Sequence, residues 1–258
     1  MPADEPDTGV GPESRPRAAP DRLGSLRLGH PPTRTGRYVL LLGFLVADIL
    51  VVGLAGASKW ATFTYTPLTA VTLLLALRTS EAKPRTMRVA FAAAVLAVVV
   101  SIVALATDSS RLNDFVYFML FALLLVSPFA IGRVILTSRQ VTPRLLIGAI
   151  CVYLMIGLLF TFLYLGVNGV HPNFFKQGVE TEPSIYLYFS FITMTTVGYG
   201  DFTPASAVPR VLVVLEALLG QIYLVTAVAR LVSLYSRTPS DNQAGVDQDD
   251  RSKETRSR

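Results

Sequence analysis

The sequence predicts an all-α membrane protein with six membrane-spanning helices, and three observations lead to this prediction. First, 52% of the 258 residues are hydrophobic, 16% are charged, and the mean hydropathy is +0.49, which is too apolar for an ordinary soluble domain. Second, the apolar residues gather in six runs of roughly the length that crosses a bilayer. Third, basic residues cluster at the ends of these runs and mainly in alternate loops, a pattern typical of membrane proteins.

The expected helices follow from the six apolar runs, which cover residues 37–57, 61–78, 88–107, 114–136, 144–167 and 209–234. The second run is the least typical, because it is short, begins with several threonines and contains Pro67. Residues 1–36 are rich in Pro, Gly, Arg and Asp without periodicity, and residues 237–258 are polar with mixed charge. Both segments are predicted to be disordered cytoplasmic arms.

The basic residues between the runs predict the orientation. They precede the first run, separate the second from the third, flank the link from the fourth to the fifth, and close the sixth. These residues are Arg27, Arg34, Arg37, Arg78, Lys83, Arg85, Arg88, Arg133, Arg139, Arg144, Arg230 and Arg237. The alternate loops carry few positive charges, namely Lys59, Arg111 and Lys176. The positive-inside rule therefore predicts a multi-pass protein of the plasma membrane with both termini in the cytoplasm.

Several function classes are disfavoured by the same sequence. The single cysteine, Cys151, lies in an apolar run and fits a small buried hydrophobe. His30 and His171 lie far apart without neighbouring metal ligands. The pI near 9.5 could suggest nucleic acid as a partner, but no basic stripe interleaved with aromatics is present. We find no enzyme signature, and we expect no cofactor and no nucleic-acid partner.

The most informative motif lies between the fifth and sixth runs, where residues 193–201 read Thr-Met-Thr-Thr-Val-Gly-Tyr-Gly-Asp. Gly198 and Gly200 tolerate the unusual dihedrals that turn several carbonyls to one side. The motif alone could be a glycine-rich turn. However, residues 184–195 before it form an amphipathic segment too short to cross a bilayer, with Pro183 suited to a first helical turn. A long apolar run follows the motif, and this context favours a re-entrant loop.

This motif resembles the selectivity filter of potassium channels, and residues 144–236, about a third of the chain, resemble their two-helix pore domain. The resemblance implies a potassium channel in which backbone carbonyls replace the water around K⁺. The implied ion-binding residues are Thr196, Val197, Gly198, Tyr199 and Gly200. Asp201 would lie at the outer mouth and attract cations. Because the chain carries one such motif, a ring of carbonyls implies a homotetramer.

The resemblance also assigns roles along the last apolar run. Gly220 resembles the hinge glycine at which inner helices bend. Close packing against a neighbouring helix is the alternative, and the two interpretations are compatible. The residues Gln221, Leu224, Val228 and Val232 share one helical face. By resemblance this face lines the cavity, with Gln221 near the filter and the other three forming an apolar gate. The alternative is that these residues only pack within the bundle.

Two acidic residues lie inside apolar runs, where charges are costly and often functional. Glu216 is expected behind the filter or the short helix that precedes it, with Thr193, Thr195, Tyr186 or Tyr188 as its hydrogen-bond partner. Aromatic support of the filter is expected from Tyr188 and Phe189.

Asp48 lies within the first run. Its expected partner is Arg133, on the assumption that both residues lie in the inner half of the membrane. A site that senses protons or a ligand is the functional alternative.

Residues 37–143 form a four-helix membrane domain that resembles voltage-gated channels only in topology. Its fourth run carries one arginine, Arg133, so steep voltage gating is not expected. Opening is expected to depend on the membrane domain, the filter, lipids or an unidentified partner. Two other functions stay open, a potassium transporter subunit and a non-conducting sensor or assembly subunit on a channel scaffold. The single intact motif argues against both.

Overall fold

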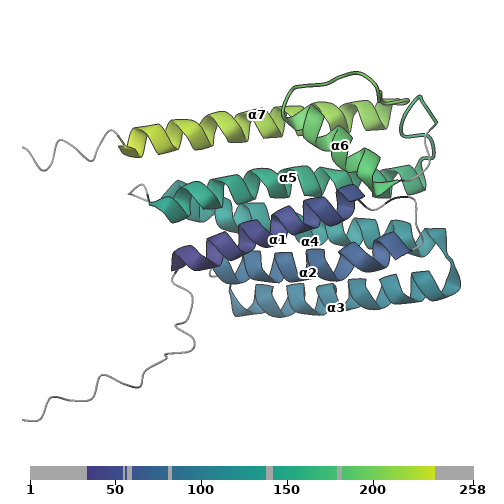
Figure 1. Cartoon of the computed structure of the whole chain (residues 1–258), viewed down its shortest axis with the longest axis horizontal. Helices are drawn as coiled ribbons and strands as arrows, with labels where there is room; N and C mark the ends of the chain where they lie inside the picture. Colours follow the sequence, from purple (N-terminus) through teal and green to yellow (C-terminus); the bar gives the residue numbers. More distant parts are fainter. Residues whose placement is uncertain are drawn as a thin grey trace, which may run out of the picture. The chain divides into compact units, whose positions relative to one another are not determined.

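The computed structural model describes residues 34–54, 56, 60–80, 83–137, 142–178 and 182–235. Within these ranges the chain forms helices and no strands (Figure 1). The helices are α1 (Arg34–Leu54), α2 (Trp60–Thr79), α3 (Pro84–Thr107), α4 (Ser110–Thr137), α5 (Pro143–Val170), α6 (Pro183–Met194) and α7 (Ala207–Tyr235). The predicted all-α fold is confirmed for this part of the chain. The two predicted arms lie outside the described residues, except for positions 34–36.

Five of the described helices are long and apolar enough to cross a membrane, namely α1, α3, α4, α5 and α7. The sixth expected span, α2, is not among these described segments, and it contains Pro67 and several threonines. Several of its hydroxyls donate to carbonyls within the helix. Thr66 and Thr72 donate to the carbonyls of Thr62 and Leu68, at 2.6 and 3.0 Å. Helix α2 packs against α1, α3 and α4. Its passage through the membrane stays a prediction.

Helix α5 is the centre of the packing, because it contacts α1, α4, α6 and α7. Its membrane-length segment is 67% buried, whereas that of α7 is 17% buried. The buried side chains around α5 include Leu41, Leu45, Leu120, Leu124 and Phe162. In contrast, the main contacts of α7 are with α5 and α6. Much of its apolar surface is uncovered in the single chain.

Prolines mark the beginnings of three helices. Pro84, Pro143 and Pro183 each occupy the first turn, where the missing N–H costs nothing and the fixed φ angle suits the helix. Helix α5 continues to Val170, beyond the predicted end at residue 167. The loop after it is tied back by the N–H of Phe174, which donates to Asn168 Oδ1 at 3.1 Å.

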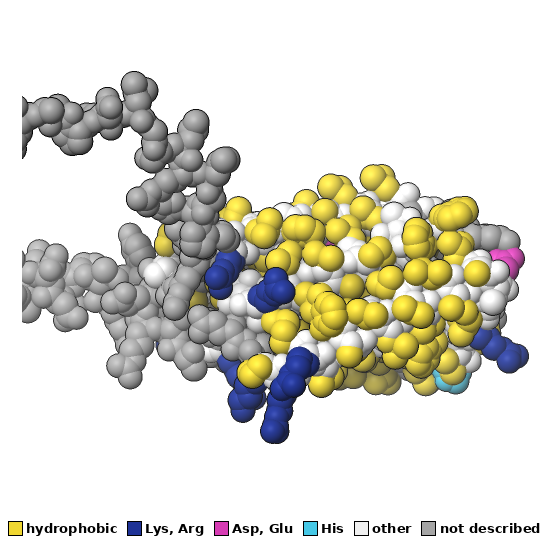
Figure 2. All heavy atoms as spheres, turned by 90° about the horizontal axis from the view of Figure 1, so that it is seen from below, with side chains coloured by type: hydrophobic (Ala, Val, Ile, Leu, Met, Phe, Trp, Pro, Cys, Tyr) yellow, Lys and Arg dark blue, Asp and Glu magenta, His cyan; other side chains and the backbone are white. Residues whose placement is uncertain are grey.

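The charges of the described helices are unevenly distributed. Figure 2 shows most of the Lys and Arg side chains on this face gathered near one end of the helices, with the apolar surface between the two ends. This arrangement is the one that the sequence pattern indicates. The assignment of that end to the cytoplasm stays a prediction.

The predicted pair between Asp48 and Arg133 is wrong. Asp48 is fully buried, its Oδ1 accepts a hydrogen bond from Thr69 Oγ1 at 3.0 Å, and its Oδ2 has no hydrogen-bond partner. Asp48 lies in the last third of α1 and Arg133 lies near the end of α4. Because α1 and α4 run in opposite directions (Figure 1), these two positions are at opposite ends of the helices.

Candidate functional site

The candidate site begins at the end of α6, a helix of 12 residues that the sequence predicts. The chain turns sharply there and folds back on the helix. The Ile192 carbonyl accepts hydrogen bonds from the N–H groups of Val197 and Gly198, at 2.9 and 3.1 Å, and the Thr196 N–H donates to the Thr193 carbonyl at 3.0 Å. These bonds satisfy carbonyls that a helix end otherwise leaves open and fix where the next segment begins.

Residues 196–200 have left-handed backbone angles at every second position. The φ angles are +61° at Thr196, +49° at Gly198 and +81° at Gly200. In a regular strand, successive carbonyls point to opposite sides. A left-handed angle at every second residue turns the backbone there, and this favours carbonyls that point to one side. Thr196 is β-branched, and a positive φ is an outlier for such a residue. Such strain costs about 1–3 kcal/mol and clusters at functional sites.

Tyr188 supports this segment through two contacts. Its ring stacks on the ring of Tyr199, with centroids 6.5 Å apart and an interplanar angle of 6°. Its hydroxyl donates to Asp201 Oδ2 at 2.8 Å. This hydrogen bond raises the pKa of Tyr188 to about 12. The other predicted support, Phe189, lies in a separate cluster with Tyr164, Phe174 and Phe175.

Glu216 lies fully buried on α7 and joins three helices. Its Oε2 accepts a hydrogen bond from the Tyr164 hydroxyl of α5, and its Oε1 accepts one from the Ser190 hydroxyl of α6, each at 2.5 Å. The Ser190 oxygen also lies 2.8 Å from the Gly157 carbonyl oxygen. Both carboxylate oxygens therefore have a donor, as a buried carboxylate requires.

The structure places Glu216 against α6, but the hydrogen-bond partners predicted for it are wrong. Tyr188 donates to Asp201, and Thr195 donates to the Phe191 carbonyl within its own helix at 2.6 Å. The Tyr186 hydroxyl has no hydrogen-bond partner. Neither oxygen of Glu216 contacts Thr193. The sequence did contain a signal for Ser190, a small hydroxyl residue four positions after Tyr186 and therefore on the same face of the helix.

The Met194 carbonyl, at the last residue of α6, forms a second junction. It accepts hydrogen bonds from Gln221 Nε2 of α7 at 3.2 Å and from the Tyr153 hydroxyl of α5 at 3.4 Å. A Cβ atom at Gly220 would lie 2.6 Å from Met194 Cγ. The close-packing interpretation of Gly220 is therefore confirmed, while its role as a hinge stays a prediction.

Residues 149–237 match the family model described as an ion channel. The match covers most of α5, all of α6, the segment with alternating backbone angles, and α7. This part of the chain is therefore similar to an ion-channel domain, and the described residues include helices suited to a membrane. No curated protein matches the chain.

The α7 face predicted to line a cavity is largely uncovered in the single chain. Leu224, Val228 and Val232 are exposed, whereas Gln221 is partly buried because its amide group binds the Met194 carbonyl. The contact predicted between Gln221 and a hydrated ion stays a prediction, as does the apolar gate.

Gly220→Ala is expected to destabilise the protein by about 1–3 kcal/mol, the usual cost of overpacking. The added methyl group would overlap Met194 Cγ, whose backbone is held by Gln221. The measurement is unfolding of the purified full-length protein in detergent. Gly43→Ala is the matched control, because Gly43 also lies in a helix but has open space around it. Equal stability of the two variants would contradict the prediction, and Met194→Ala should partly rescue Gly220→Ala.

Proposed function

We propose that four copies of this chain form a potassium-selective channel, which conducts K⁺ passively across the plasma membrane. The observation that carries the proposal is the Thr-Val-Gly-Tyr-Gly segment, with left-handed angles at Thr196, Gly198 and Gly200, at the end of a short helix in an ion-channel domain. One chain supplies one such segment, and coordination around an ion needs several. A closed four-fold ring meets this need.

Potassium selectivity would come from the backbone oxygens of residues 196–200. A K⁺ ion loses its water when it enters a narrow ring, and inward carbonyls replace that water at low cost. The Thr196 hydroxyl would add the innermost ring of oxygens. Asp201 would raise the local concentration of cations at the outer mouth. In this arrangement Tyr188 holds both Tyr199 and Asp201.

The uncovered surface of the single chain supports assembly. Tyr199 is 73% exposed and Val197 is 51% exposed, although both belong to a segment with strained backbone angles. Several apolar residues of α7 are exposed as well, including Val211, Val214 and Leu218. Contacts with neighbouring copies would cover part of this surface and hold the strained segment in place. Six spans, with α2 among them and both termini in the cytoplasm, complete the proposed topology.

The test is ion flux from liposomes that contain the purified full-length protein. We expect K⁺ flux that Na⁺ cannot replace and that Ba²⁺ blocks. Equal flux of Na⁺ would contradict potassium selectivity. An assembled tetramer without any flux would favour a closed gate or a non-conducting scaffold. Leu224→Ala, which widens the proposed gate, separates these two, because only a closed channel would then conduct.

A further inference from the structure

Asp48 of α1 is a fully buried carboxyl group to which the proposed channel assigns no role. Its two oxygens have different surroundings. Oδ1 accepts a hydrogen bond from Thr69 Oγ1 of α2 at 3.0 Å, whereas Oδ2 has no hydrogen-bond partner. An ionised carboxylate is costly to bury unless it is paired with a cation and hydrogen-bonded. With one donor, the charged form of Asp48 would be poorly stabilised.

Among the residues that the structure describes, no cation of the neighbouring helices compensates this carboxyl group. Helix α1 packs mainly against α2, α5 and α6. The basic residues of these four helices lie near helix ends and are Arg34, Arg37, Arg78 and Arg144. Their other titratable side chains are phenols and one thiol, namely Tyr38, Tyr65, Tyr153, Tyr164, Tyr186, Tyr188 and Cys151. The side chains that interact with Asp48 are the uncharged hydroxyls of Thr69 and Thr72.

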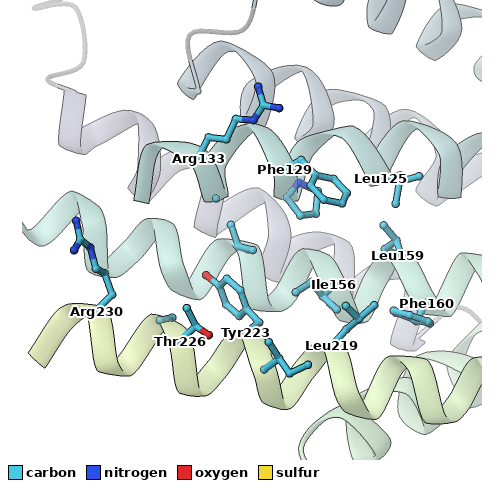
Figure 3. Close-up of a pocket in the computed structure, with 15 residues that line it drawn as sticks. Leu125, Phe129, Arg133, Ile156, Leu159, Phe160, Leu219, Tyr223, Thr226 and Arg230 are labelled. Carbon is cyan, nitrogen blue, oxygen red and sulfur yellow. The ribbon is translucent and has the colours of Figure 1, made fainter. Parts of the chain in front are cut away.

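Arg133 and Arg230, near the C-terminal ends of α4 and α7, do not meet this need either. Both line a groove between α4, α5 and α7 (Figure 3), and each already has an interaction. Neither is among the groups that act on Asp48. Within the described part of the chain, Asp48 is therefore held by hydroxyl groups alone.

Buried threonines give α2 a polar face inside the protein. Thr62, Thr66, Thr69 and Thr72 are all buried and recur every three or four residues, so they share one side of the helix. The Thr72 hydroxyl interacts with Asp48, but it donates its hydrogen to a carbonyl of its own helix at 3.0 Å. The Thr72 oxygen therefore offers Asp48 an acceptor and not a donor.

We propose that Asp48 is a proton-binding site, which holds one proton on Oδ2 as a neutral carboxylic acid. The proton comes from water and cancels the single negative charge of the carboxylate. Oδ1 continues to accept the hydrogen bond from Thr69, and Oδ2 becomes a donor for which the Thr72 oxygen is the acceptor. Loss of the proton leaves a buried charge between α1 and α2, so these two helices are held together more weakly at high pH. The site does not depend on potassium selectivity.

The test is infrared spectroscopy of the full-length protein in liposomes at a series of pH values. A protonated carboxyl group has a C=O stretching band that an ionised one lacks. The difference between the unmodified protein and Asp48→Asn isolates the band of this residue from those of Glu216 and the other acids. We expect the Asp48 band well above about pH 4, where an exposed aspartate loses its proton, and its disappearance at higher pH. A carboxyl group that is ionised throughout this range would overturn the proposal.

Three threonine variants of nearly equal shape test the arrangement of the proton. Thr72→Val should lower the proton affinity of Asp48 about fivefold, because the acid loses its acceptor. Thr69→Val should raise it by a similar factor, because the ionised form loses its donor. Thr66→Val is the matched control, because the Thr66 hydroxyl donates to the Thr62 carbonyl within α2. A rise in both Thr69→Val and Thr72→Val would mean that both hydroxyls stabilise a charged carboxylate, which contradicts the proposal.

Unfolding in detergent gives an independent measurement. Above about pH 4 the unfolded chain has released the Asp48 proton, while the folded protein still holds it. Each further pH unit should therefore raise the unfolding equilibrium constant about tenfold through this site, until the folded protein also loses the proton. Asp48→Asn cannot ionise, so it should lack this contribution. An equal pH dependence of unfolding in the two proteins would count against a proton at Asp48.

Discussion

Gly198→Ala is expected to abolish selective potassium flux, whereas Gly178→Ala is expected to leave it unchanged. Both glycines have φ angles in the left-handed region, +49° and +62°, and a Cβ atom at either position would meet open space. An L-residue pays about 1–2 kcal/mol for this conformation. Four copies in a ring would pay about 4–8 kcal/mol at Gly198, all of it within the proposed ion-binding segment. At Gly178 the same strain falls in a loop.

The measurement compares K⁺ and Na⁺ flux from liposomes for the two variants, after size-exclusion chromatography has established that both assemble like the unmodified protein. Similar loss of K⁺ flux in both variants would mean that general instability, rather than the geometry of residues 196–200, is responsible. Unchanged selectivity in Gly198→Ala would contradict the proposed filter directly.

Counted per chain, Glu216→Leu is expected to cost more stability than any other single change discussed above. The substitution leaves the hydroxyls of Tyr164 and Ser190 buried without their acceptor. A buried polar group that loses its partner costs about 1–3 kcal/mol, so the two together cost about 2–6 kcal/mol. The Ser190 hydroxyl can still turn to the Gly157 carbonyl, which places the expected loss in the lower half of this range.

The decisive comparison is the triple variant Tyr164→Phe/Ser190→Ala/Glu216→Leu. Replacing all the partners of a polar contact by apolar groups is often nearly neutral, so this variant should be more stable than Glu216→Leu alone. Unfolding in detergent measures both. A triple variant that is less stable than the single one would mean that Glu216 does not act through these two hydroxyls.

The sequence was most informative where structure depends on neighbouring residues in the chain. Apolar runs of membrane-spanning length correspond to α1, α3, α4, α5 and α7. Pro183 and the short amphipathic segment after it predicted α6, and the glycines at 198 and 200 predicted unusual backbone angles. The left-handed angle at Thr196 could not be predicted, because a β-branched residue avoids it and only the surrounding structure can hold it there.

The partners of buried polar groups were the least predictable part. Contact between helices depends on the rotation of each helix about its axis and on the depth of each residue. The rotation of α6 about its axis decides that Ser190 rather than Tyr188 meets Glu216. Depth along the helices decides that Thr69 rather than Arg133 meets Asp48. The depth could have been inferred from the sequence. Consecutive helices alternate in direction, so late positions in the first and fourth helices lie at opposite ends.

The junction at the Met194 carbonyl has a thermodynamic consequence. The residue that ends α6 is bonded to Gln221 and packed directly against Gly220, and both belong to α7. A displacement of α7 at this level must therefore either break these contacts or carry the end of α6 with it. In a conducting ring, ion occupancy and the position of α7 would then be linked functions. If a bound K⁺ stabilises one position of α7 by some free energy, then α7 in that position raises the affinity for K⁺ by the same free energy.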